Sequence, residues 1–393
     1  MGIIDTMKSL LPISARSFRA QAQWEAREIK HIEERIDALQ DSFDSLHRHI
    51  DDRAQPLEEQ NRTIIDEARA VDAKQNIRFW GLYGDGSGSI DQRRAFFKSL
   101  PQARGGARLL QLALAHLLHE FADFCADNDI DNWWLIGGTL LGADRHAGFI
   151  PWDDDLDVGI MRDSLMQLIK LINNREVEGS DKFTVTVVWD RNADCKQIRL
   201  HSTRDNVPGF IDLFIFDWCP AVDESLVKKN SLARARVRAR LREIEAQGDQ
   251  LQNWIPATES AYMDALDSHN EDAKIIATAF DDAIEDLRNQ HVICSKQDAH
   301  AIIRSIDNLD APRNFHWNVS LHNMFPTKLL EFEGHRYPVP REYVYFNEES
   351  YRNPYDLPND IGLHYEHVSQ DVMKDDKVRQ AIEEYISDEH LHG

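Results

Sequence analysis

The sequence predicts an α+β fold in which a mixed β-sheet is flanked by helices and extended by helical additions. Segments rich in β-branched and aromatic residues, typical of strands, occur at 133–136, 156–160, 183–189, 195–201 and 209–216. Helix-forming stretches surround them, the longest at 107–128 and 222–310. A further helix is predicted at 29–50, where apolar residues recur at the three- and four-residue steps of a coiled coil.

Composition limits the class of protein. The 393-residue chain is 42% hydrophobic and 29% charged, which is typical of a soluble globular protein. Its formal net charge of −23 argues against a nucleic-acid partner, which would need a basic surface. The four cysteines lie far apart without metal-site spacing, which indicates reduced thiols in a cytosolic protein. No apolar run approaches the ~18 residues of a membrane span and no signal-peptide pattern occurs, so a cytoplasmic location is expected.

Residues 1–76 are expected to form an N-terminal helical arm. Its heptad-spaced apolar residues are Ile29, Ile32, Ile36, Leu39, Phe43, Leu46 and Ile50. Leu57 and Ile64 keep the same phase, although Pro56 should break or kink the helix. So polar a helix needs a partner, either a second copy of the chain or the protein's own core, and we favour a parallel homodimer. Residues 1–21 suit either a membrane-surface helix, peripheral to the inner face of the membrane, or ordinary tail packing.

A linker is expected at 77–106, and the catalytic core is expected at 107–221. GDGSGS at 84–89 is typical of a flexible connection. The amphipathic helix at 107–128 should lead into the buried strand that begins at Trp133, and a helix is expected at 163–174. This order places the segment after the first strand at an edge of the sheet.

That segment begins with Gly137-Gly138-Thr139, which we expect to form a turn. Glycine lets the backbone turn sharply and approach a ligand closely, and amides at such a turn suit phosphate oxygens. Arg145 and His146 follow a few residues later, and a guanidinium can bind phosphate through two parallel hydrogen bonds. The pattern favours a phosphate-binding role.

Four carboxylates come next within five positions, at Asp153, Asp154, Asp155 and Asp157. On a strand, Asp153, Asp155 and Asp157 would share one face and Asp154 would point away. Crowded carboxylates repel each other unless a cation neutralises them, and hard oxygen ligands suit Mg²⁺ or Mn²⁺. A solvated loop or a helix cap would also explain the acids. A calcium-binding EF-hand loop would not, because it requires glycine where Val158 stands.

A further acid, Asp212, lies in the alternating apolar segment GFIDLFIF at 209–216. A carboxylate among apolar residues is costly unless it is paired or bound to metal. Asp212 is therefore either half of a structural ion pair or a third carboxylate of the site, acting as ligand or base. Asp217 is a candidate cap at the strand end.

These residues together carry a family resemblance. The stretch GGTLLGADRHAGFIPWDDDLDVGIMR at 137–162 resembles the signature of the LicD/fukutin family of phosphotransferases, which have the nucleotidyltransferase fold. The resemblance resumes at 209–218 and at 325–340, where FPTKLLEFEGHRYPVP resembles the family's Phe-Glu-Gly segment. The family's usual Tyr-Gly is Tyr351-Arg352 here, which puts the acceptor end in doubt.

The resemblance implies a nucleotidyltransferase-like core and a metal-dependent transfer. A phosphorylated alcohol, such as a phosphocholine-, glycerol phosphate- or ribitol phosphate-like group, would pass from a cytidine diphosphate (CDP) donor to a hydroxyl of a cell-surface glycan or glycolipid. By this resemblance the metal ligands and catalytic residues are Asp155, Asp157 and Asp212, with Asp153 assisting. The donor would contact Gly138, Thr139, Arg145, His146 and Arg199. Two other functions stay open, a metal-dependent glycosyltransferase that uses a nucleotide-sugar and a non-catalytic coiled-coil scaffold.

The rest of the chain is expected to form a helical insertion at 222–310, a C-terminal part of the core at 311–366 and a loosely held polar tail at 367–393. Residues 228–242 of the insertion hold seven basic residues and no acid. This basic segment would either pair with the acidic surface of the protein or contact an anionic polymer, lipid headgroups or phosphate.

Overall fold

The computed structural model describes residues 60–190, 195–246, 271–307, 317–351, 353–358 and 371–387, with Lys30, Pro56 and Val368. The chain divides into two compact units, 1–82 and 83–393. In the first unit, a helix runs over residues 60–82. Apart from Lys30, the heptad region and the 1–21 segment lie outside the described residues. The homodimer and membrane-surface predictions therefore stay predictions.

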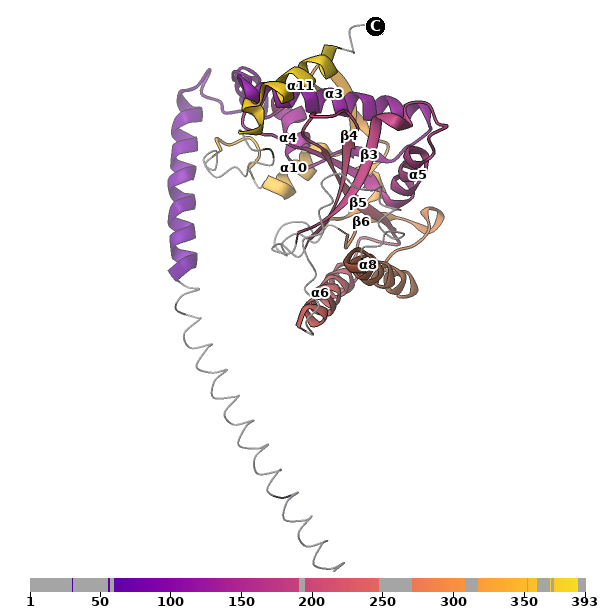
Figure 1. The fold of residues 1–393 in the computed structure, drawn as a ribbon. Coiled ribbons are helices and arrows are strands. Elements are labelled where there is room, and N and C mark those ends of the chain that lie inside the picture. Colours follow the sequence, from indigo (N-terminus) through magenta and orange to yellow (C-terminus); the bar gives the residue numbers. More distant parts are fainter. Residues whose placement is uncertain are drawn as a thin grey trace, which may run out of the picture. The chain divides into compact units, whose positions relative to one another are not determined.

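The second unit is built on a seven-stranded mixed sheet (Figure 1). Five of its strands lie in the order β1 (Trp133–Leu135), β2 (Leu156–Met161), β5 (Ile211–Cys219), β4 (Cys195–Ser202) and β3 (Phe183–Asp190). The other two are β6 (Ala301–Arg304), which pairs with β5, and β7 (Asn318–Ser320), which pairs with β6. Only β2 and β5 run parallel among these pairs. The predicted α+β class with a mixed sheet is confirmed.

Two amphipathic helices bury their apolar sides against the sheet. They are α3 (Gly106–Asp127) and α5 (Arg162–Asn173), close to the helices predicted at 107–128 and 163–174. On α3, the residues Leu110, Leu114, Leu117 and Phe121 are buried at helical spacing, which gives one continuous apolar stripe. That stripe fixes the helix that precedes β1, so the segment after β1 starts from a rigid support.

The helix α11 (Asp376–Ser387) packs on α3 and corrects the prediction of a loosely held tail. Its residues Ile382 and Tyr385 are buried, and the Tyr385 hydroxyl donates a hydrogen bond to Glu120 at 2.5 Å. The tail was predicted as loose because its polar composition hid an amphipathic pattern with only a few apolar residues.

Two other predictions of local structure are wrong. The helix α2 (Ile90–Lys98) lies inside the expected linker; Ser89 caps it and Phe97 is buried. The strand β6 lies inside the stretch 222–310 that was predicted as almost wholly helical, together with the helices α6 (Glu224–Ala246) and α8 (Glu271–Asn289). In both cases packing of a few apolar side chains outweighs the composition of the surrounding residues. The expected domain boundaries themselves stay predictions.

The C-terminal part of the chain returns to the first strands. It contains α9 (Leu321–Met324), the hairpin β8 (Lys328–Phe332) and β9 (His335–Val339), and α10 (Tyr343–Tyr351). The strand β9 lies against β1, while β8 and α10 lie against the helix α4 (Gly137–Arg145). Segments distant in sequence therefore meet beside α4. None of the described helices combines the length and the apolar character that crossing a bilayer requires.

Candidate active site

A row of charged residues crosses three neighbouring strands. Asp157 on β2 stands directly opposite Asp212 on the parallel strand β5. Arg199 on β4 stands opposite Asp212 on its other side. Residues in register on adjacent strands point to the same face of a sheet, so the three side chains form one row. The predicted position of Asp212 beside the acidic strand is confirmed.

The two glycines at 137 and 138 make room for carboxylates. A Cβ atom at Gly137 would lie 2.2 Å from Oδ2 of Asp157, and one at Gly138 would lie 2.8 Å from Oδ2 of Asp153. Gly137 also has a φ of +59°, which favours glycine. The predicted turn is in fact the first turn of α4, entered directly from β1. The glycines therefore let the acidic residues approach the start of this helix.

Polar contacts hold Asp157 against α4. The Gly138 amide donates to Oδ2 of Asp157 at 3.3 Å, and the Thr139 hydroxyl accepts from the Asp157 amide at 2.8 Å. The Gly138 amide, which was predicted to hold donor phosphate, thus faces a carboxylate in this structure. The hydroxyl of Thr139 fixes the first turn of α4 to the acidic strand.

Burial and mutual repulsion disfavour the charged forms of Asp153 and Asp157. Burial raises the pKa of Asp157 well above its ordinary value, and the charges of Asp155, Asp212 and Asp153 raise it further. Burial, followed by the charge of Asp155, likewise raises the pKa of Asp153. Asp154 makes a separate contact, accepting from the Val368 amide at 3.2 Å. A cluster of mutually repelling buried carboxylates is typical of functional sites.

The donor set suits a hard divalent cation, because Asp153, Asp155, Asp157 and Asp212 all offer carboxylate oxygens. Their mutual repulsion is the charge that such a cation would neutralise. In the described ranges, however, no three His, Cys, Asp or Glu side chains are arranged so that they could hold a metal ion as they stand. The metal ligands and the choice of Mg²⁺ or Mn²⁺ therefore stay predictions.

Arg199 engages Asp212 directly. Its Nε donates to Oδ1 of Asp212 at 2.9 Å, and its guanidinium lies 3.9 Å from the centre of the Phe210 ring. The ion pair that was one of the two alternatives for Asp212 is thus present, and it lies inside the acidic site. Burial, and then the charge of Arg199, lower the pKa of nearby His201 to about 4. The imidazole therefore adds no positive charge beside the pair at neutral pH.

Arg145 and His146 lie at the end of α4 and contact α2. The Arg145 guanidinium is buried over the Phe97 ring at 4.1 Å, and its Nη1 donates to the Pro354 carbonyl at 2.7 Å. Its charge partly offsets the raised pKa of Asp153, which places it within electrostatic range of the acids. Burial, and then Arg145, lower the pKa of His146 to about 3. A neutral imidazole is a poor partner for a phosphate anion, so the geometry favours Arg145 over His146 as a donor-binding group.

Tyr351 is a site residue that sequence reasoning noticed only as part of a motif. It ends α10, and the residue as a whole is 40% exposed, although protein atoms surround its hydroxyl. Burial raises the pKa of its hydroxyl, and the carboxylates of Asp157, Asp153 and Asp155 raise it further. A neutral phenol that can donate a hydrogen bond therefore lies in the field of the acidic group. In the sequence, Tyr351 was notable only as the first residue of the Tyr351-Arg352 pair that replaces the family's Tyr-Gly.

A buried network around Asp144 joins the segments that surround the site. The Asp144 carboxylate accepts from Arg94 of α2 at 2.7 Å, from the Tyr355 hydroxyl at 2.5 Å and from the Asn347 amide of α10 at 3.1 Å. Arg94 precedes α4 in the sequence, and Asn347 and Tyr355 follow it. The sequence carries no signal for this network, because Asp144 looks like an ordinary polar residue of the spacer between the glycines and the acids.

The glutamate of the Phe-Glu-Gly segment has a structural role. Glu333 pairs with Arg108 of α3 through both carboxylate oxygens, at 3.1 and 2.6 Å, and accepts from the Phe149 amide at 3.0 Å. Gln111 of α3 donates to the carbonyl oxygens of Ile150 and Asp153. The loop that leads into the acidic strand is therefore fastened to α3 at several points.

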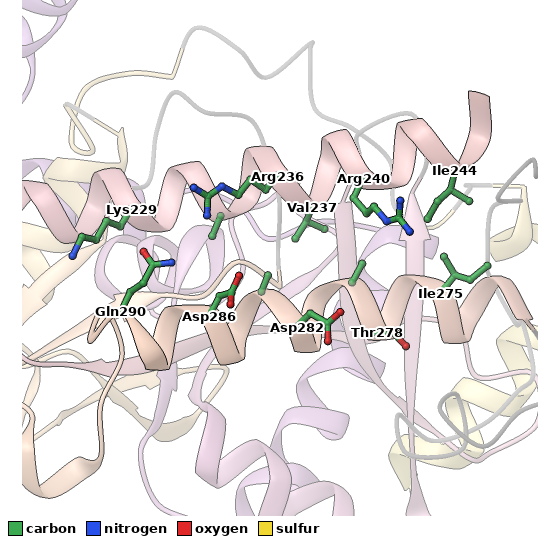
Figure 2. Close-up of a pocket in the computed structure, with 13 residues that line it drawn as sticks. Lys229, Arg236, Val237, Arg240, Ile244, Ile275, Thr278, Asp282, Asp286 and Gln290 are labelled. Carbon is green, nitrogen blue, oxygen red and sulfur yellow. The ribbon is translucent and has the colours of Figure 1, made fainter. Parts of the chain in front are cut away.

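The basic segment 228–242 lies on α6 and lines a groove of about 670 Å³ against α8 (Figure 2). One wall carries Lys229, Arg236 and Arg240, and the opposite wall carries Asp282 and Asp286. The facing acids favour the first alternative for the basic segment, interaction with the protein's own acidic surface. They would repel a polyanion that entered this groove.

Comparison with known proteins adds independent information on the same residues. Residues 131–242 match the family model described as LicD/FKTN/FKRP, nucleotidyltransferase domain. This range contains the glycines, the acidic strand and Asp212, so the predicted resemblance is confirmed for 137–162 and 209–218, while the segment 325–340 lies outside the matched range.

Several curated proteins are similar over parts of the chain. Lipopolysaccharide cholinephosphotransferase LicD of Haemophilus influenzae is 32% identical over 117 residues, which cover 28% of this chain and 44% of that protein. Ribitol 5-phosphate transferase FKRP of Mus musculus is 32% identical over 78 residues, covering 19% of this chain and 15% of that protein. An uncharacterized protein of Rickettsia prowazekii, RP689, is 41% identical over 68 residues, covering 17% of this chain and 25% of its own. The chain thus spans less than half the length of these relatives.

Proposed function

We propose that this chain, whose residues 131–242 match the LicD/FKTN/FKRP nucleotidyltransferase domain, transfers a phosphorylated alcohol from a CDP-activated donor. The acceptor would be a hydroxyl of a cell-surface glycan or of a glycolipid precursor. The observation that carries the proposal is the row of Asp157 and Asp212 on parallel strands, set against the glycine entry to α4. Two relatives support the type of group moved, since their names describe a cholinephosphotransferase and a ribitol 5-phosphate transferase.

The acidic group would hold the cation that such a transfer uses. Asp155, Asp157 and Asp212 would be ligands of Mg²⁺ or Mn²⁺, with Asp153 in support. A bound divalent cation neutralises the negative charge of a diphosphate. A hydroxyl can then attack the phosphorus atom more easily. The repulsion that raises the pKa of Asp157 would provide part of the driving force for cation binding.

Side chains around the acids would position the two substrates. Arg145 and Arg199 are the guanidinium groups near the acidic residues that could bind a diphosphate. Asp212, where it is not a ligand, would accept the proton of the attacking hydroxyl. Tyr351 would donate a hydrogen bond to a phosphate or acceptor oxygen, since its raised pKa keeps the phenol protonated.

The test is donor turnover by the full chain in the presence of Mg²⁺ or Mn²⁺. CDP-choline, CDP-glycerol, CDP-ribitol and a set of UDP-sugars would be compared by the release of cytidine monophosphate or UDP. We expect release from at least one CDP-alcohol, and its loss in Asp157→Asn. Turnover of a UDP-sugar with none of the CDP-alcohols would favour the glycosyltransferase alternative. Neither binding nor turnover of any donor would favour the non-catalytic scaffold.

A further inference from the structure

We propose that Arg199 changes partners during substrate binding. In the donor-free protein it holds Asp212; when a divalent cation takes the Asp212 carboxylate, the guanidinium turns to the diphosphate of the donor. This inference rests on the proposed function and deepens it. It assigns Arg199 two roles: it competes with the cation for the Asp212 carboxylate, and it binds the donor.

The first support is position. The register places Asp157, Asp212 and Arg199 side by side on the same face of β2, β5 and β4. A cation shared by Asp157 and Asp212 would therefore lie beside the guanidinium and repel it. The Arg199 side chain is 18% exposed, so it can reach a ligand that enters the site.

The second support is the form of the ion pair. Arg162 holds Asp217 through two nitrogens, at 2.6 and 3.0 Å. Arg108 likewise holds Glu333 through two nitrogens. By contrast, the bond from Arg199 to Asp212 uses Nε. Both terminal amino groups of Arg199 stay outside that bond, and they form the fork that fits two phosphate oxygens.

The third support is the aromatic platform under the guanidinium. Arg199 lies 3.9 Å from the centre of the Phe210 ring, and Phe210 immediately precedes β5. The attraction between a cation and a ring face is not strongly directional, so the side-chain torsions of Arg199 can change while its guanidinium stays over the ring. A rotation of this kind would exchange Asp212 for a phosphate without loss of the stacking contact.

The arrangement also explains why the acids do not form a ready metal site. Asp212 is paired with Arg199, while Asp153 and Asp157 are repelled by their acidic neighbours. Among the described residues no preassembled group of three metal-binding side chains exists. Cation and donor would thus bind cooperatively, because each frees a group that the other requires.

The experiment separates the two halves of the exchange with Arg199→Gln and Arg199→Lys. Binding of Mn²⁺ alone would be measured by electron paramagnetic resonance, and binding of CDP at saturating Mn²⁺ by calorimetry. In Arg199→Gln we expect Mn²⁺ to bind about tenfold more tightly, because its competitor for Asp212 is gone. In the same variant CDP should bind at least ~10-fold more weakly, because the forked phosphate contact is gone.

Arg199→Lys is the matched variant, since it retains the charge and removes the fork. We expect Mn²⁺ to bind to it about as it binds to the wild-type protein, and CDP to bind more weakly. Melting temperatures would show that both variants fold. Unchanged or weaker Mn²⁺ binding in Arg199→Gln, or unchanged CDP binding in both variants, would overturn the exchange. If the wild-type protein binds neither Mn²⁺ nor CDP, the proposed function fails and the exchange fails with it. If it binds both and only the variants deviate from expectation, the exchange alone fails.

Discussion

At Gly137 a single added carbon would collide with the carboxylate of Asp157. Gly137→Ala combines a Cβ contact of 2.2 Å with a φ of +59°, and relief of the contact requires a shift of the Asp157 side chain or of α4. We expect a loss of stability of about 1–3 kcal/mol from backbone strain, with a further loss from the collision, and loss of donor turnover. Thermal melting and the turnover assay would measure these effects.

The matched control for Gly137 is Gly105→Ala. Gly105 has a φ of +61°, but a Cβ atom there meets nothing within 4 Å. It places alanine at a positive φ, here with a ψ of −135°, without the collision, and it should keep donor turnover. Equal losses of stability at the two positions would show that contact with the carboxylate is not what demands glycine at 137.

Removal of a site charge should stabilise the metal-free protein. The pKa of Asp157 is raised in the folded state, so the folded protein binds more protons than the unfolded chain between the ordinary and the raised pKa values. Stability therefore falls as pH rises through this window, and the penalty is fully present above the raised pKa. Asp157→Asn lacks this penalty. In EDTA, its melting temperature should exceed that of the wild type at neutral pH.

The difference in melting temperature between Asp157→Asn and the wild type should shrink as the pH falls toward the ordinary carboxyl pKa. There the wild-type carboxyl is protonated in the folded protein and is neutral like asparagine. Asp131→Asn, at an exposed position, serves as the control for a change of net charge. If Asp157→Asn melts below the wild type at neutral pH in EDTA, the Asp157 carboxylate stabilises the fold instead of straining it.

At the scale of elements, the Asp144 network fastens α2 and α10 to α4. Tyr355→Phe removes one hydroxyl that bonds Asp144 and should cost about 0.5–1.5 kcal/mol. Asp144→Ala removes the nearer of the two carboxylates that Arg94 contacts, together with the acceptor of Tyr355 and Asn347, and should cost about 1–3 kcal/mol. Hydrogen exchange of the α2 amides should rise in the same order. Equal exchange in both variants would show that α2 is held by apolar packing alone.

Sequence reasoning succeeded where a strand signal was local. The alternation of 209–216 predicted a strand that contains Asp212, and β5 is that strand, with Asp212 opposite Asp157. It failed at α4, because two glycines favour a turn while the burial of Leu140 and Leu141 favours a helix. It also failed at Asp144, whose partners Arg94 and Tyr355 lie 50 and 211 positions away. No local pattern reports such distant hydrogen bonds.

For the whole molecule, self-association stays a prediction carried by the heptad at 29–50. Burying one large aliphatic side chain contributes roughly 1.5–3 kcal/mol, so several in a seam can outweigh the cost of association. Deletion of residues 1–75 should convert a dimer to a monomer in light scattering and leave transfer to a soluble acceptor largely intact. A full-length chain that is already monomeric at micromolar concentration would contradict the dimer.

The helix α2 also decides where the chain can be shortened. Boundaries drawn from composition would start a minimal protein at residue 107, after the glycine-rich stretch. Such a protein would lack Arg94 and Phe97, so the Asp144 carboxylate would lose a cation and the Arg145 guanidinium would lose its aromatic support. A protein that starts at residue 83 retains both. A shortened protein for expression or crystallisation should therefore retain residues 83–106, although their composition is typical of a linker.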